Sequence, residues 1–147
     1  MGKWSLDLSK YAKARKEQIK DIQRGFAFNL YSSIVKKTPV DTGRARGNWN
    51  ISPDKDDTTV KEITTPQYTS KEQVKAPSGD GSIFISNNVP YICKLEYGGY
   101  PNPPKKGNGK TTGGYSTQAP EGMVGVAMAN AEEYMKQAVA QSEKENK

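Results

Sequence analysis

The stretch Thr38-Pro39-Val40-Asp41-Thr42-Gly43-Arg44 separates a long helical pattern from the strands that follow it. Before it, apolar residues recur mostly at steps of three and four, the spacing of one helical face: Leu8, Tyr11, Ala12, Ile19, Ile22, Phe26, Leu30 and Ile34. Pro39 disfavours helical geometry at Thr38, so we expect the helix to end near Lys37. A helix of about 28 residues is roughly 40 Å long, and its first half should project beyond the core.

After Arg44, alternation of side chains predicts two strands, at Arg46–Ser52 and at Ser82–Ser86. The first strand alternates between two faces, with Asn48, Asn50 and Ser52 on one and Trp49 and Ile51 on the other. Residues 53–81 form a polar insertion between the strands, with a weak strand predicted at Thr58–Thr64. The two clear strands predict a small antiparallel sheet.

The rest of the chain predicts a short helix, a flexible loop and a final helix. Tyr91–Tyr97 reads as the short helix, which opens at Pro90 and closes at Gly98. In residues 99–118, eight of twenty are Gly or Pro, which predicts a flexible loop. The final helix should start at Pro120, with an apolar face made of Val124, Ala127, Met128, Ala131, Tyr134, Met135 and Ala138. Its alanines indicate close approach to another element, and residues 141–147 should fray. Residues 1–147 are therefore predicted to form a single α+β domain.

Composition argues against an enzyme and against a bound cofactor or metal. The 147 residues include no histidine, which is the commonest general base and neutral metal ligand. Cys93 is the single cysteine, so we expect neither an internal disulfide nor a thiolate metal cluster. No segment has the roughly 20 apolar residues of a membrane span. The N-terminal residues lack the apolar run of a signal peptide, so we expect a cytoplasmic site of synthesis.

The positive charge lies in the first third of the chain. Residues 1–50 carry 11 Lys/Arg and 4 Asp/Glu, whereas residues 51–147 carry 11 and 12. A basic cluster lies on the predicted first helix and includes Lys10, Lys13, Lys16, Lys20 and Arg24. Such a cluster can contact nucleic-acid phosphates or an acidic protein neighbour. The simpler interpretation is a solvated helix face, which Glu17 and Asp21 partly balance.

Three other groups of residues have a chemical interpretation and a simpler one. Asp54, Asp56 and Asp57 could bind a cation, but they lack the spacing of a calcium loop and fit a solvated turn. Residues 107–112 lack the glycine spacing of a phosphate-binding loop. Aromatic side chains that could stack on bases, but fit packing in a core or interface better, are Trp49, Tyr91, Tyr97 and Tyr100.

Three segments together resemble the neck, tail-completion and minor tail proteins of long-tailed bacteriophages. The first is Thr38–Arg44, between a long helix and a strand that contains Trp49. The second runs from Ile85-Ser86-Asn87-Asn88 through Pro90-Tyr91 to Leu95-Glu96-Tyr97-Gly98, and the third is Gln118-Ala119-Pro120-Glu121-Gly122-Met123. The residues that carry the resemblance are Pro39, Asp41, Thr42, Gly43, Arg44, Trp49, Tyr91, Glu96, Tyr97, Gly98 and Pro120.

The resemblance implies a structural virion protein that joins the head connector to the tail and has no catalytic site. It implies a homo-oligomeric ring, most often of six subunits, assembled in the bacterial host cytoplasm. Its expected partners are a head-closure or connector protein and a tail terminator or tail-tube protein, with genomic DNA nearby. Within the first segment, we expect Gly43 to allow a positive φ and Arg44 to pair with a carboxylate, for which Glu96 is a candidate. The alternative is a small basic protein that binds nucleic acid through its first helix.

Overall fold

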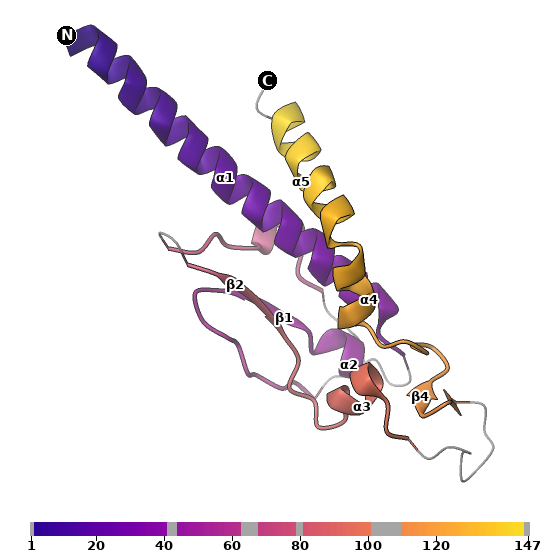
Figure 1. The fold of residues 1–147 in the computed structure, drawn as a ribbon. Coiled ribbons are helices and arrows are strands. Elements are labelled where there is room, and N and C mark those ends of the chain that lie inside the picture. The colour runs from indigo at the N-terminus through magenta and orange to yellow at the C-terminus, as the bar shows by residue number, and fades with distance from the viewer. Residues whose placement is uncertain (1, 41–43, 63–67, 79–80, 101–109, 146–147) are drawn as a thin grey trace.

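The computed structural model describes residues 2–40, 44–62, 68–78, 81–100 and 110–145, and only the backbone of residues 2–12 and of Thr112. The described chain has an α+β fold, as the sequence predicts. A long N-terminal helix packs against the C-terminal helices on one side and against a two-stranded antiparallel sheet on the other (Figure 1). Among the described residues, no helix combines the length and the apolar character needed to cross a membrane.

Helix α1 spans Gly2–Lys37 and ends where Pro39 predicts. Its N-terminal part extends beyond the rest of the molecule (Figure 1). Residues 13–17 are exposed, and the first buried residue of the helix is Gly25. The apolar stripe of α1 therefore continues past the core, because Ile19 belongs to that stripe and is 65% exposed.

Helix α2, Arg44–Gly47, occupies the place where we predicted the start of a strand. Strand β1 begins later and spans Asn50–Pro53. The Asn48 side chain explains the delay, because its Nδ2 donates to the Arg44 carbonyl oxygen at 2.7 Å and stabilises the helical turn. Strand β2, Ile83–Ser86, pairs with β1 in an antiparallel register that places Ile51 opposite Ile85.

Side chains rather than a third strand hold the polar insertion. The strand predicted at 58–64 is absent from its described part, residues 58–62. Asn48 accepts from the Lys61 amide at 2.6 Å and donates to the Lys61 carbonyl at 2.9 Å. Asn50 donates to the carbonyls of Asp57 and Thr59, both at 3.0 Å. The polar face predicted for the first strand thus fastens the backbone of the insertion, which also contains a short 3-10 helix, η1, at Lys71–Gln73.

Helix α3, Ile92–Tyr97, is the short helix expected from Pro90 and Gly98, and Gly98 ends it with a φ of +81°. Part of the loop expected at 99–118 is ordered as a small hairpin. Strands β3, Thr111–Thr112, and β4, Tyr115–Ser116, pair antiparallel. Residues 101–109 of that expected loop lie outside the described residues.

The C-terminal helix expected from Pro120 is two helices, α4 at Val124–Ala129 and α5 at Ala131–Glu145. Gly122 adopts a φ of +85° and delays the start until Val124. The expected fraying is wrong for residues 141–145, which are helical; Ser142 is buried there, and Glu145 forms an ion pair with Lys71 at 3.6 Å. Residues 146–147 lie outside the described residues.

The expected close approach of the alanine-rich helix is confirmed. A Cβ placed on Gly25 of α1 would lie 3.4 Å from the Ala138 Cβ of α5. Asn29 donates to the Tyr134 carbonyl at 3.1 Å, and the Ser33 and Tyr134 hydroxyl groups are 2.7 Å apart. The core lies at the C-terminal half of α1 and comprises Leu30, Tyr31, Ile34, Val35, Ala45, Trp49, Leu95, Ala119, Met123 and Ala127.

Candidate functional site

The first sequence segment fixes the end of α1. The fully buried Thr38 hydroxyl donates to the Ile34 carbonyl at 2.7 Å and accepts from the Trp49 Nε1 at 2.8 Å. The Arg46 guanidinium donates to the Thr38 carbonyl at 2.8 Å and 3.1 Å and to the Lys36 carbonyl at 3.3 Å. These bonds satisfy carbonyl groups that a helix end leaves without intrahelical partners. Arg46, which the sequence analysis did not single out, therefore stabilises the end of α1.

Arg44 forms an ion pair with Glu62 at 2.8 Å, not with the Glu96 that we considered as its partner. The Glu62 side chain is 81% exposed, so solvent screens this pair. The neighbouring residues of the segment, Asp41, Thr42 and Gly43, lie outside the described residues, and the prediction of a positive φ at Gly43 stays a prediction.

The second segment binds the third through one carboxylate. Both Glu96 oxygens accept from backbone amides at the start of α4, those of Met123 at 2.9 Å, Val124 at 2.5 Å and Gly125 at 3.1 Å. Amides at a helix start lack intrahelical acceptors, and the helix dipole favours a negative charge there. Glu96 is therefore a long-range N-terminal cap, and it serves a helix that begins 28 residues later.

Gly122 permits this close approach of α3 and α4. A Cβ at this position would lie 2.5 Å from the Glu96 carbonyl oxygen and 2.9 Å from its Oε2. Both the contact and the positive φ favour glycine. Met123, which follows, is fully buried in the core. Gly122 of the third segment is therefore required for the close contact in which Glu96 caps α4.

Further bonds join the third segment to the first, and the second segment to Ala45, the residue that directly follows the first. The Gln118 side chain accepts from the Val40 amide at 2.8 Å and donates to the Val40 carbonyl at 3.1 Å, as a neighbouring strand would. Asn87 of the second segment donates to the Ala45 carbonyl at 2.8 Å. All three segments therefore meet at one end of the molecule, and we call this meeting place the three-segment junction.

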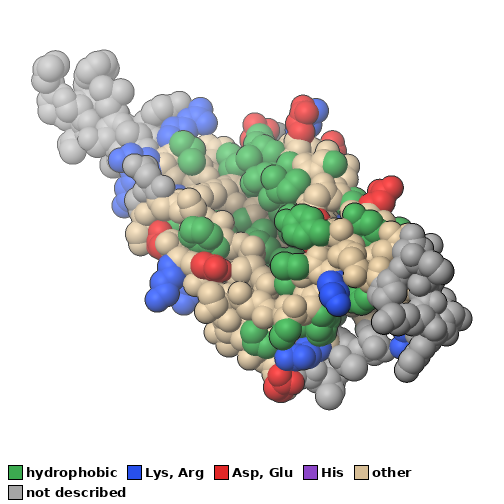
Figure 2. Space-filling model, turned by 60° about the horizontal axis from the view of Figure 1, so that its bottom comes forward, with side chains coloured by type: hydrophobic (Ala, Val, Ile, Leu, Met, Phe, Trp, Pro, Cys, Tyr) green, Lys and Arg blue, Asp and Glu red, His purple; other side chains and the backbone are tan. Residues whose placement is uncertain are grey.

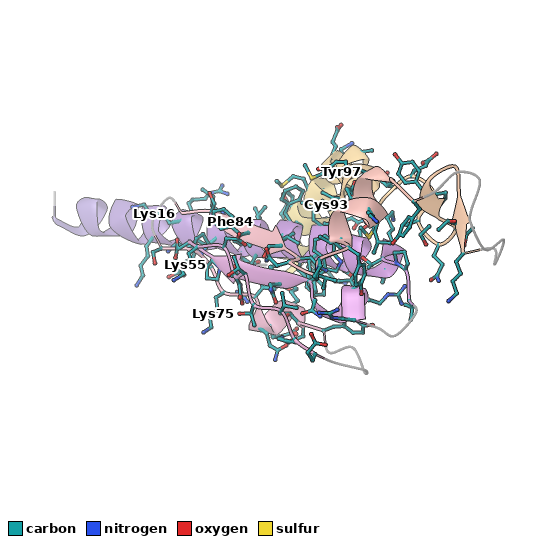
Figure 3. The ribbon with its side chains drawn as sticks, turned by 90° about the horizontal axis from the view of Figure 1, so that it is seen from below. Lys16, Lys55, Lys75, Phe84, Cys93 and Tyr97 are labelled. Carbon is teal, nitrogen blue, oxygen red and sulfur yellow. The ribbon has the colours of Figure 1, made fainter. Side chains whose placement is uncertain are left out.

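The remaining residues of the resemblance are divided between packing and surface. Trp49 is buried, and Tyr91 packs partly buried against the core. Gly98 adjoins the Tyr115 ring, which would lie 3.1 Å from an added Cβ. Tyr97 points outward from α3 and is 76% exposed (Figure 3). Pro39 is half-buried after α1, and Pro120 is exposed before α4.

The basic cluster predicted on the first helix is smaller than expected. Lys13, Lys16 and Lys20 are exposed on the projecting part of α1, where Figure 3 labels Lys16. Arg24 is half-buried, and its Nε donates to the Val74 carbonyl at 2.6 Å, so it anchors the insertion. The Lys10 side chain lies outside the described residues.

Of the three aspartates weighed as a cation site, Asp54 and Asp57 accept hydrogen bonds from backbone amides of the same chain. Both Asp54 oxygens accept from the Ser78 amide at 3.0 Å. Hydrogen bonds from the Thr59 hydroxyl and amide lower the pKa of Asp57. No group of three or more Asp, Glu, Cys or His in the described part is arranged to hold a metal ion. Most of residues 107–112 falls outside that part.

Two of the seven side chains predicted for the apolar face of the final helix are exposed rather than packed against the core. Met128 is 53% exposed and Met135 38% exposed, although both belong to the apolar face predicted for the final helix. Figure 2 shows hydrophobic side chains gathered near the middle of one face, with both acidic and basic side chains around them. Sequence spacing identified the stripe but could not show that α1 covers only part of it.

Comparison of the chain with protein-family models, with curated proteins and with solved structures finds no match.

Proposed function

We propose that this protein is a structural component of a phage neck, which joins the head connector to the tail as a tail-completion or neck-ring protein. The observation that carries the proposal is the three-segment junction. The segments on which the resemblance rests are far apart in the chain, yet Glu96 binds the second segment to the third and Gln118 binds the third to the first. Asn87 of the second segment binds the carbonyl of Ala45, which directly follows the first. A chance likeness of three short segments gives no reason for them to share one packing unit.

The chemistry of the junction supports an architectural role. Its polar side chains bind backbone amides and carbonyls of the same chain, so these groups are occupied in holding elements together. Such an arrangement stabilises a shape rather than activating a nucleophile or a water molecule. In the proposed ring no reactive group is needed, because the protein acts by contact with its neighbours above and below.

The test is deletion of the gene for this chain from the phage genome that carries it. Filled heads and finished tails should accumulate unjoined, and supply of the wild-type chain from a plasmid should restore joined particles. A second plasmid that carries Glu96→Gln tests whether the joining of heads to tails depends on the intact three-segment junction. Normal yields of infectious, joined particles without the chain would refute the proposal.

A second candidate function rests on the exposure of Lys13, Lys16 and Lys20 on the projecting part of α1. These lysines recur at steps of three and four, so they lie along one helical face and could contact phosphates. If they do, the affinity for duplex DNA should fall steeply with salt, and replacing all three with Gln should reduce the salt slope by about 3. A slope that these replacements leave unchanged would exclude this use of the helix.

A further inference from the structure

Two exposed surfaces of this chain are complementary in charge and both carry unpaired apolar side chains. The first, the α1 overhang surface, consists of Lys16, Ile19 and Lys20. The second, the α4–α5 surface, consists of Met128, Glu132 and Met135. All six side chains are exposed.

The α1 overhang surface lies where the apolar stripe of α1 extends beyond the packed core. Ile22 and Phe26 of the stripe are half-buried, and Leu30 and Ile34 are buried, but Ile19 is 65% exposed. Lys16 precedes Ile19 by three positions and Lys20 by four, so the Lys16 side chain is a neighbour of both on the helix. Helix α1 as a whole carries nine Lys/Arg and three Asp/Glu. A partner for Ile19 must therefore tolerate, or favour, positive charge.

The α4–α5 surface offers apolar groups in an acidic setting. Glu132 and Met135 lie three positions apart on α5, so they are neighbours on one helical face, and Met128 lies on α4 just before it. Helix α5 carries four Glu and two Lys. Glu132 lies 3.5 Å from Lys136, but both side chains are more than two-thirds exposed, so this pair is weak and can exchange for another cation.

The two surfaces are too far apart to contact each other within one chain. Helices α1 and α5 run antiparallel, and Gly25 lies against Ala138. Counting from that contact, Ile19 and Met135 lie on opposite sides of it, some nine residues or about 13 Å apart along the helix axes. Figure 1 shows the same separation between the projecting end of α1 and helix α4.

We infer that the α1 overhang surface of one copy docks on the α4–α5 surface of a second copy, in a head-to-tail contact. Charge selects this arrangement over its symmetric alternatives, because two overhangs packed together would juxtapose lysines, and two α4–α5 surfaces would juxtapose glutamates. A head-to-tail contact uses different surfaces on each copy, so it propagates into a ring or a chain. The inference rests on the proposed function in one respect, since it names the surfaces through which a neck ring would close.

The test is disulfide trapping in the full-length protein. The exposed Cys93 is first replaced by Ser. Cysteine is then introduced at position 16 or 19 together with position 132 or 135, which gives four double variants and four single variants. An intrachain disulfide is excluded by geometry, because the Cα atoms of a disulfide lie within about 7 Å. Each protein is oxidised mildly at high concentration and separated on a denaturing gel.

At least one double variant should give a ladder of dimers, trimers and larger species, while the single variants stay monomeric. In the variant with cysteine at positions 19 and 135, Lys16→Glu with Lys20→Glu should slow the cross-linking at least tenfold, and adding Glu132→Lys with the neighbouring, exposed Glu133→Lys should restore it. Dimers from a single variant would show a symmetric contact and overturn the inference, as would the absence of a ladder in all four double variants. Tight DNA binding that blocks the ladder would instead assign the lysines to nucleic acid.

These outcomes are separate from those of the proposed function. A ladder from a chain that deletion shows to be dispensable for joining heads to tails would keep the contact and remove the neck role. A chain needed for joining that gives no ladder would keep the neck role and remove this contact.

Discussion

Glu96→Gln removes the charge from the cap that joins α3 to α4 and preserves the size of the side chain. The carboxylate accepts from the amides of Met123, Val124 and Gly125 within 3.1 Å. Glutamine retains one acceptor oxygen, but its NH2 group cannot accept from these amides. A hydrogen bond to a charged group contributes about 1.5–3 kcal/mol, and a carboxylate at a helix start contributes about 0.3–1 kcal/mol more.

We therefore expect Glu96→Gln to lower the unfolding free energy by about 2 kcal/mol, since part of the hydrogen bonding survives. For a chain of this length, that change corresponds to a fall in Tm of about 6 °C. The assay is urea unfolding followed by circular dichroism, with a thermal melt beside it. Glu121→Gln is the matched control, because Glu121 is exposed in the same region of the chain.

The control should stay within about 0.5 kcal/mol of wild type. A loss for Glu96→Gln that is no larger than that of the control would refute the reasoning. It would mean that water serves the α4 amides as well as the carboxylate does, and that the second and third segments do not depend on each other for stability.

Three other positions test the packing independently. Gly122→Ala should cost more than about 2 kcal/mol, because φ is +85° and the backbone of α3 lies 2.5 Å from the added Cβ, whereas Gly125→Ala in α4 should be neutral or stabilising; urea melts compare the two. Asn48→Ala should cost about 3 kcal/mol, because the buried amide binds three backbone groups, and the exposed Asn88→Ala should cost under about 0.5 kcal/mol in the same assay. The lowered pKa of Asp57 implies a stabilising contribution that is complete above about pH 4 and is lost as pH falls through that pKa, so Asp57→Asn should flatten the acid limb of a stability–pH curve; an unchanged limb would contradict this.

The elements with local signals were predictable from the sequence. The end of α1 follows from Pro39, and the end of α3 follows from Gly98, because each residue restricts its own backbone or that of its neighbour. The alternation around Ile85 predicted β2 for a similarly local reason.

Long-range partners decide the features that the sequence did not reveal. Glu96 and the amides it caps are 27 to 29 residues apart, and no local pattern connects them. Burial of Ser142 and the ion pair between Lys71 and Glu145 hold the C-terminal turn of α5, which is why the expected fraying was wrong there. Arg46 binds the end of α1 because it lies in the helical turn of α2, where the sequence predicted the start of a strand.

The candidate site also combines features that the sequence revealed with features that depend on long-range contacts. Sequence reasoning identified the three segments but not that they meet, since their contacts depend on tertiary packing. It also assigned Arg24 to a basic face, although its guanidinium is used by the carbonyl groups of the insertion. The exposure of Met128 was unexpected because residue spacing identifies an apolar stripe but does not show how much of that stripe another helix covers.

The central claim is that this chain is a ring component of the phage neck, and a symmetry-resolved electron cryomicroscopy map of the virion neck tests it most directly. The account predicts rotationally repeated density at the head–tail junction, most simply sixfold, into which the α1–α5 pair and the three-segment junction fit without rearrangement. A complete neck map in which every density belongs to other chains, or in which this chain is present without rotational symmetry, would contradict it.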